Sequence, residues 1–274
     1  MNFHSLKRRL PQVFTAVLFL PPFLACSQNI SFQPSILDFH VPAGASQSQV
    51  VKVSNYSNKK MIFQAYLGDW YRDSSGGHRY FRPDTLSRSC ARWIKLNRNT
   101  VEIDSGKTEE IIVQMQPPAD MKEVNEMKWS MLFLQTNPEQ QGAAEKGKNV
   151  STQVKEILRV GIHIYETPPN VSRKLAKADT LMKIDTIRNA YDFKIRNIGE
   201  VMIQCKANME LTDINTGQQY KLEQSEFPMF PDAKRTVRFT VPATVPKGKY
   251  SALAILDYGE DAALEAVTKE IEVQ

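Results

Sequence analysis

The 274-residue sequence has few cysteines and histidines and lacks the short motifs that mark common catalytic sites. Its 3 Cys and 4 His form no HExxH pattern and no cluster with the spacing of zinc ligands. It contains no GxSxG, no phosphate-binding glycine loop and no GxGxxG. These absences predict a protein with no metal site, no cofactor and no enzymatic activity.

Dense basic tracts are also missing from the sequence. The formal charge of +5 includes Lys7, Arg8 and Arg9, and the first 27 residues hold no Asp or Glu. The rest of the chain carries 32 Lys or Arg and 30 Asp or Glu, with no basic run interleaved with aromatic residues. We therefore expect no nucleic-acid partner.

Only the start of the chain has a long apolar run. This run, Val13 to Leu24, follows the basic residues and is short for a membrane-spanning helix, so residues 1–27 are predicted to be a signal peptide. Ala25-Cys26-Ser27 suits cleavage before Gln28, which would release a periplasmic protein. Phe23-Leu24-Ala25-Cys26 resembles a lipobox, which would leave a lipoprotein anchored to the membrane at Cys26.

Outside the leader, two cysteines remain, Cys90 and Cys205. An exported protein can form disulfides, so a bridge between them is one interpretation. The other is a pair of buried thiols, because free cysteine behaves as a small hydrophobic residue. The wide separation of the two residues in the sequence favours buried thiols.

The body of the chain has no long segment with helical periodicity and consists of short alternating segments separated by turn residues. Alternation around Val51 and Val53 ends at the turn Asn55 to Asn58, and an aromatic-rich strand precedes a turn at Asp73 to Gly77. Further strands are predicted at Trp93 to Leu96, Val101 to Ile103, Ile111 to Met115 and Lys128 to Gln135. This pattern predicts an all-β protein built from β-sandwiches.

The aromatic residues Trp70, Tyr71, Tyr80 and Phe81 flank that turn. They are interpreted either as cross-strand packing or as a platform for a carbohydrate or peptide. Packing is favoured.

The second half of the chain repeats the order of signals in the first. VKVSNYS at Val51 to Ser57 aligns with FKIRNIG at Phe193 to Gly199, and KWSMLFL at Lys128 to Leu134 aligns with KYSALAI at Lys249 to Ile255. We therefore predict two sandwiches in tandem, covering residues 28–168 and 169–274. Tyr250 lies where a tyrosine corner would fix the start of a late strand.

The stretch VKEILRVGIHIYETPPN, from Val154 to Asn170, closes the first predicted domain. Apolar residues occupy every second position until a double proline, which is typical of a strand with one apolar face. Either that face fills the protein's own core or it serves a partner. We predict a divided strand, in which Ile162 and Ile164 serve the core and Val150 to Leu158 is offered to a partner.

Four motifs appear in a specific order: SILDFHVPAG, ARWIKLNRNTVEIDSGKTEEIIVQMQPP, EMKWSMLFLQT and ILRVGIHIYETPP. In this order the sequence resembles the periplasmic pilus-assembly chaperones of the PapD type. The resemblance implies two immunoglobulin-like domains and a last strand of the first domain that is donated to a subunit lacking a strand. The implied partners are exported pilin-like or other surface subunits.

The sequence also departs from that family. The family holds the terminal carboxylate of its subunit with an Arg on the first strand and a Lys on the last. Here the first position falls near Ile36, Arg159 is the nearest basic residue on the last strand, and Glu156 interrupts the donor pattern. The resemblance, carried to this chain, gives six candidate partner-binding residues: Val150, Thr152, Val154, Leu158, Arg159 and Val160.

A second functional class remains open at this point. A lipid-anchored immunoglobulin-like component of a surface or secretion assembly would have the same domains, but it would hold a permanent partner. Acylation at Cys26 favours this alternative, and a mature chain that starts at Gln28 favours the chaperone.

Overall fold

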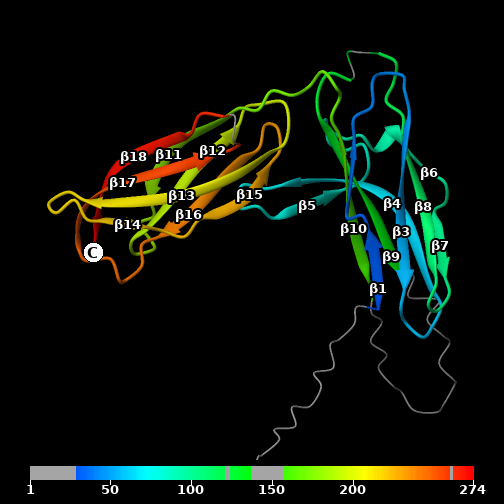
Figure 1. Cartoon of the computed structure of the whole chain (residues 1–274), viewed down its shortest axis with the longest axis horizontal. Coiled ribbons are helices and arrows are strands. Elements are labelled where there is room, and N and C mark those ends of the chain that lie inside the picture. The colour runs from blue at the N-terminus through cyan, green and yellow to red at the C-terminus, as the bar shows by residue number, and fades with distance from the viewer. Residues whose placement is uncertain (1–28, 121, 123, 137–156, 260–261) are drawn as a thin grey trace, which may run out of the picture.

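The computed structural model describes residues 29–120, 122, 124–136, 157–259 and 262–274. These residues form two immunoglobulin-like β-sandwiches in tandem, set at an angle to each other (Figure 1). No helix in these ranges is long and apolar enough to cross a membrane. The predicted fold class is confirmed.

The first sandwich pairs a four-stranded sheet, in the order β1-β3-β8-β6, with a six-stranded sheet, in the order β2-β10-β9-β4-β5, in which β7 also pairs with β4. Its elements are β1 (Ile30–Gln33), β2 (Ile36–Phe39), β3 (Gln47–Asn55), β4 (Met61–Arg72), β5 (His78–Phe81), a short 3-10 helix η1 (Ala91–Trp93), β6 (Ile94–Leu96), β7 (Thr100–Ile103), β8 (Thr108–Met115), β9 (Lys128–Thr136) and β10 (Arg159–Glu166). The predicted strands of this half are present among the described residues, except that Trp93 lies in η1 and the last strand begins at Arg159. The start of the segment predicted from Val154 lies outside the described residues.

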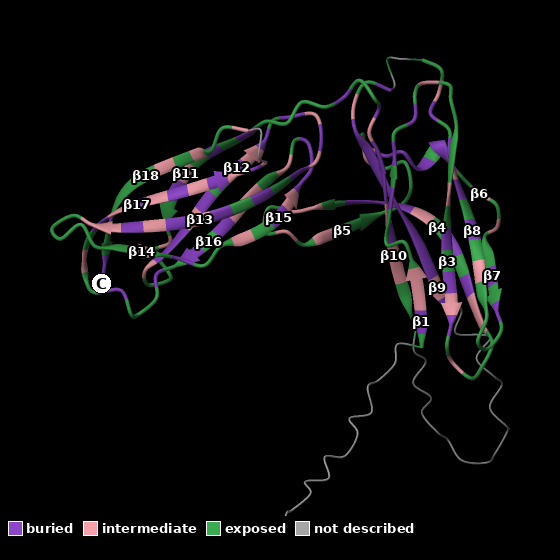
Figure 2. Ribbon diagram, viewed as in Figure 1, coloured by how far each residue is buried: buried purple, intermediate pink, exposed green. Residues whose placement is uncertain are grey.

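The first two strands of this sandwich belong to different sheets. β1 runs antiparallel to β3 in one sheet, and after the cis Gln33–Pro34 peptide β2 runs parallel to β10 in the other. Alternate residues of the facing strands fill the space between the sheets, as the purple bands in Figure 2 show. The core therefore lies between two layers and includes Leu37, Val53, Phe63 and Leu132.

The second sandwich has a three-stranded sheet, in the order β11-β12-β16, and a five-stranded sheet, in the order β14-β13-β17-β18, in which β15 also pairs with β13. Its strands are β11 (Ala176–Lys183), β12 (Ala190–Asn197), β13 (Ile203–Asp213), β14 (Gln219–Lys221), β15 (Ser225–Met229), β16 (Lys234–Thr240), β17 (Gly248–Asp257) and β18 (Glu265–Val273). A separate apolar core, which includes Phe193 and Leu211, fills it.

The sequence repeat corresponds to a buried asparagine that makes the same hydrogen bonds at one strand end in each sandwich. Asn55 ends β3 and Asn197 ends β12, and both side chains are buried. Each Nδ2 donates to the carbonyl four residues ahead and to a carbonyl of a strand in the facing sheet, while each Oδ1 accepts from the N–H two residues ahead. A buried amide that satisfies this many backbone groups fixes the strand end in both sandwiches.

Two further sequence predictions, on Tyr250 and on the two cysteines, are confirmed. The Tyr250 hydroxyl donates to the Pro246 carbonyl at 2.8 Å, which is the hydrogen bond of a tyrosine corner. Cys90 and Cys205 are buried free thiols in different sandwiches. Burial raises the pKa of both thiols to about 12, so neither is reactive at neutral pH.

A single aromatic side chain of the second sandwich fixes the junction. Phe230 is 4% exposed and lies against Trp70, Trp129 and Tyr165 of the first sandwich, with ring centroids 5.1, 4.8 and 5.5 Å away. The Arg88 guanidinium donates to the Asp232 carboxylate at 2.6 and 3.0 Å beside this contact. The two sandwiches therefore meet through an apolar contact with an ion pair at its rim.

The β4–β5 hairpin forms a second connection and reaches across to the second sandwich (Figure 1). At its tip the Ser74 carbonyl accepts from the Thr236 N–H of β16 at 2.8 Å. Gly76 has φ +95°, and a Cβ at this position would overlap the Arg235 guanidinium. The positive φ therefore favours glycine at this turn, and a side chain here would displace the Arg235 guanidinium.

Candidate partner-binding edge and inter-domain cleft

Burial along β10 changes part-way through the strand. Ile162 and Ile164 are fully buried in the first core, Val160 is half-buried and Leu158, just before the strand, is 39% exposed. The prediction that Ile162 and Ile164 serve the core is confirmed. The apolar face of this segment therefore leaves the core toward its N-terminal end.

The pairing of β10 changes at the same place. β9 pairs with the whole strand, from Arg159 to Glu166, but β2 pairs only with His163 to Glu166. On the β2 side, no described strand pairs with the first half of β10, residues 159–162. This half of β10 is thus a free strand edge as far as the described residues extend.

The direction of the backbone groups follows from two hydrogen bonds. The His163 N–H donates to the Ser35 carbonyl on the β2 side, whereas the Leu158 carbonyl accepts from Thr136 on the β9 side. Because backbone groups alternate along a strand, those of Arg159 and Gly161 face the same side as His163. They point to the free edge and are available to an added strand.

Three of the six candidate partner-binding residues, Val150, Thr152 and Val154, lie outside the described residues, and their role stays a prediction. Leu158, Arg159 and Val160 lie at the described end of the same segment. Gly161 follows them, and a Cβ there would come within 2.3 Å of the Met131 Sδ, so the edge backbone packs closely on β9.

Arg159 lies on the outer face of the six-stranded sheet rather than on the core side. Its guanidinium carbon is 3.9 Å from the Phe133 ring centroid and under 6 Å from those of Tyr66 and Tyr80. About 20 Å of extended strand separates it from Tyr165, which contacts the second sandwich. The residue that the sequence offered as a carboxylate ligand is therefore held in an aromatic cage on the first sandwich.

Of the four aromatic residues that flank the hairpin turn, Trp70 is buried and the other three are exposed. Trp70 is fully buried opposite Tyr80, which agrees with cross-strand packing. Tyr71 and Phe81 stack with ring centroids 5.6 Å apart, yet both keep more than a third of their surface exposed. Packing explains Trp70 fully and the other three in part.

The histidines are less scattered than the sequence indicated. β5 and β10 bring His78 and His163 together, with ring centroids 5.8 Å apart, and both rings contact Trp70. Both Nε2 atoms are buried without a hydrogen-bond partner in the described part of the chain. No sequence motif indicates this cluster, because it depends on contacts between strands that are distant in the chain.

This histidine cluster is neutral at physiological pH. Burial, together with the nearby His78 and Arg72, lowers the pKa of His163 to about 4. Burial and the charge of Arg72 also lower the pKa of His78. Each imidazole thus has one N–H donor and one free nitrogen lone pair. No group of three or more potential metal ligands occurs among the described residues.

Glu166 is a buried carboxylate at the end of β10, next to the junction of the sandwiches. Its Oε1 accepts the Val41 N–H at 3.1 Å, and its Oε2 has no partner among the described residues. Burial raises the pKa of Glu166 to about 7, although the Val41 hydrogen bond and His40 oppose this effect and Asp38 adds to it. The ionised carboxylate is therefore unfavourable in the folded protein.

Replacing Glu166 with Gln should change the pH dependence of stability. A carboxyl whose pKa rises from 4.5 to about 7 on folding favours the folded state less and less as pH increases through that window. The Glu166→Gln variant should unfold with a free energy about 3 kcal/mol above wild type at pH 8. At pH 4 the two proteins should be equal. Urea denaturation at both pH values measures this, and an equal difference at pH 4 and pH 8 would contradict it.

Comparison with known proteins gives a likeness of structure only. No family model matches the sequence, and no curated protein matches it. The solved structures that match include the class 5 fimbriae chaperone CfaA, at 11% identity and a TM-score of 0.45, covering 88% of this chain and 98% of that one. The YadV chaperone matches at 11% identity with a TM-score of 0.46, covering 90% of this chain and 100% of that one. The E. coli chaperone DraB matches at 12% identity with a TM-score of 0.46, covering 89% of this chain and 96% of that one.

Chaperones thus recur among the solved structures that match this chain. Identities near one tenth and TM-scores below 0.5 do not by themselves establish a shared function.

Proposed function

We propose that this chain is a non-enzymatic, chaperone-like protein of the cell envelope that binds exported surface or fimbrial subunits by pairing with a strand of the subunit. The free first half of β10 is the observation that carries this proposal. Natural sandwiches generally protect such edges, because unpaired backbone groups recruit other strands. A protein that adds strands uses such an edge together with apolar side chains at alternate positions.

The proposed contact surface combines described and undescribed residues. Backbone groups of Arg159 and Gly161 would pair with the subunit strand, and Leu158 and Val160 would supply apolar contacts. Val150, Thr152 and Val154 would continue the contact in the N-terminal direction. Ile162 and Ile164 take no part, because they are buried in the core of the chaperone itself.

The proposed location, the periplasm, follows from the signal peptide predicted at residues 1–27. After cleavage before Gln28, the protein would be soluble in the periplasm. The alternative is a lipoprotein acylated at Cys26, and such a protein would suit a structural component that keeps its partner. Measurement of the mass of the mature N-terminus distinguishes a chain that starts at Gln28 from an acylated chain that starts at Cys26.

A proline at the free edge tests strand pairing directly. In Arg159→Pro, the edge-facing N–H is lost while the hydrogen bonds of β10 to β9 are kept, since Arg159 faces away from β9. We expect this variant to fold but to lose most of the partner protein that co-purifies with the wild type from the native periplasm. Thermal melts check the fold, and quantitative mass spectrometry measures the partner.

Arg159→Ala is the matched control, because it removes the same guanidinium and its aromatic contacts but keeps the N–H. Strand pairing predicts that Arg159→Ala retains most of the partner. Equal retention by both variants would refute pairing at this edge. Equal loss in both would instead assign the binding to the guanidinium.

A further inference from the structure

β4 has a gap in its pairing on the side of β5 and β7. β7 pairs with the first four residues of β4 and β5 with the last four, which leaves residues 65–68 as a pairing gap on this side. Within it, the Ala65 N–H donates to the Asn99 carbonyl at 2.8 Å. Leu67 faces the same side as Ala65, because backbone groups alternate along a strand. Its N–H and C=O have no hydrogen-bond partner among the described residues.

Pro83 explains why β5 does not close this gap. The pairing of Asp69 with Phe81, continued by two residues, would put Pro83 opposite Leu67. Proline has no N–H to donate to the Leu67 carbonyl, and the chain turns at this residue instead of extending β5. The pairing gap is therefore a consequence of the sequence.

Two cavities open beside the pairing gap, and both are lined by Tyr66, Leu67 and Pro83. The larger, of about 500 Å³, is lined mainly by aromatic and arginine side chains, which include Tyr80 and Arg82. The smaller, of about 370 Å³, extends toward η1 and β6. Cavities of this size are typical of small-ligand sites.

Tyr66 and Tyr80 present partly exposed rings to the larger cavity. Tyr66 stacks on Phe133 with ring centroids 5.3 Å apart, and its hydroxyl donates to the Gln135 side chain at 3.0 Å. Tyr80 packs edge-on against the same phenylalanine, with ring centroids 5.5 Å apart. Because neighbours already hold both rings, a ligand that stacks on them costs little conformational freedom.

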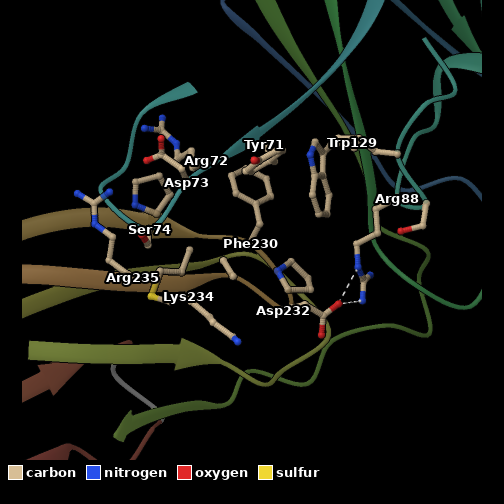
Figure 3. A pocket seen from close by; sticks show the side chains of 16 residues that line it. Tyr71, Arg72, Asp73, Ser74, Arg88, Trp129, Phe230, Asp232, Lys234 and Arg235 are labelled. Atoms are coloured by element: carbon tan, nitrogen blue, oxygen red, sulfur yellow. Dashed lines mark hydrogen bonds and ion pairs between the residues drawn. The ribbon is translucent and has the colours of Figure 1, made fainter. Parts of the chain in front are cut away.

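These cavities are separate from the junction of the sandwiches. Tyr71, on the same hairpin, lies with Trp129 and Phe230 at the cavity between the two sandwiches (Figure 3). That cavity shares no lining residue with the two at the pairing gap. A ligand at the pairing gap would therefore leave the junction unchanged.

We propose that the pairing gap binds a pyranose sugar with equatorial hydroxyl groups, such as a gluco-configured residue of a glycan. Neighbouring hydroxyls on such a ring would accept from the Leu67 N–H and donate to the Leu67 C=O. The apolar face of the ring would stack on Tyr80 and Tyr66, and Arg82 at the rim would donate to further hydroxyls. The proposal does not rest on strand pairing at β10.

An extended peptide is the alternative occupant, and the pairing gap favours a sugar over it. Strand addition gains its affinity from a row of backbone hydrogen bonds. Here only Leu67 has both groups free, because the Ala65 N–H is already bonded and β5 closes the gap from Asp69 onward. One donor and one acceptor match a pair of sugar hydroxyls, and the exposed rings match a flat sugar face.

Calorimetric titration of the full mature protein with cellotriose, a trisaccharide of β-linked glucose, tests the site. We expect binding that is about tenfold weaker in Tyr80→Ala, which loses the more exposed ring. Arg82→Gln changes an exposed rim residue and should also weaken binding, so it tests the site even if Tyr80→Ala is unstable. Tyr56→Ala is the matched control, because it removes a still more exposed tyrosine after β3 and should bind as wild type does. Thermal melts check that each variant is folded.

O-methylated cellotriose tests the hydrogen bonds to Leu67. It keeps the ring faces but has no hydroxyl to donate, and it should bind about tenfold more weakly or not at all. In NMR spectra the Leu67 amide signal should shift when cellotriose is added, while the amide signal of Leu211 in the second core should not.

No binding of cellotriose or of its N-acetylated analogue chitotriose at about 10 mM would overturn the proposal. Unchanged binding in both Tyr80→Ala and Arg82→Gln, equal binding of the O-methylated sugar, or an unmoved Leu67 signal would do the same. Stronger binding of an acetylated tetrapeptide than of either sugar would assign the pairing gap to a polypeptide instead. Arg159 also lines the larger cavity, but no variant here changes β10, so this test and the strand-pairing test fail independently.

Discussion

Ile162→Asp should unfold the first sandwich. The side chain is fully buried between the sheets, and none of the core residues around it carries an opposite charge. An unpaired buried charge costs about 4 kcal/mol or more, which is a large part of a total stability of about 5–15 kcal/mol. Circular dichroism and thermal melts should show loss of the cooperative transition of this sandwich.

Leu158→Asp is the matched control on the same strand face. Leu158 keeps 39% of its surface exposed, so an introduced carboxylate would remain hydrated. We expect a change in stability of about 1 kcal/mol or less, together with weaker binding of the co-purifying partner. Val154→Asp extends the same test to the undescribed part of the segment. Unfolding by Leu158→Asp as severe as that of Ile162→Asp would make the whole segment ordinary core and would remove the mechanism of the proposed function.

Phe230→Ala should separate the two sandwiches. The ring is nearly buried among Trp70, Trp129 and Tyr165, and its removal leaves a cavity at the centre of the junction. Truncation of a buried phenylalanine costs about 3 kcal/mol or more. Small-angle scattering should show a larger radius of gyration, and limited proteolysis should cut faster at the predicted domain boundary, after Pro169.

Phe239→Ala provides the comparison for that result. Phe239 is equally buried but lies in the core of the second sandwich, away from the junction. It should lower the stability of the second sandwich by a similar amount, without changing the scattering profile under native conditions. If Phe230→Ala leaves the radius of gyration and the cleavage rate at wild-type values, the ion pair of Arg88 and the hairpin contact are enough to hold the sandwiches together.

The sequence by itself determined the features that depend on local periodicity. Alternation with period two places Ile162 and Ile164 on one face, whatever strand lies beside them. The paired signals around Asn55 and Asn197 indicated two copies of one sandwich, because each asparagine closes its own local turn. The Tyr250 hydrogen bond spans only four residues and was predictable for the same reason.

Only the tertiary structure decided which edges and side chains meet. The free edge at Arg159 and Gly161 exists because β2 joins β10 at His163 and no earlier, and no local pattern specifies the register of two distant strands. His78 and His163, and likewise Gly76 and Arg235, come together through the fold of the long β4–β5 hairpin against β10 and β16. Such contacts join residues far apart in the chain, so their chemistry follows from packing between elements rather than from the pattern within any one of them.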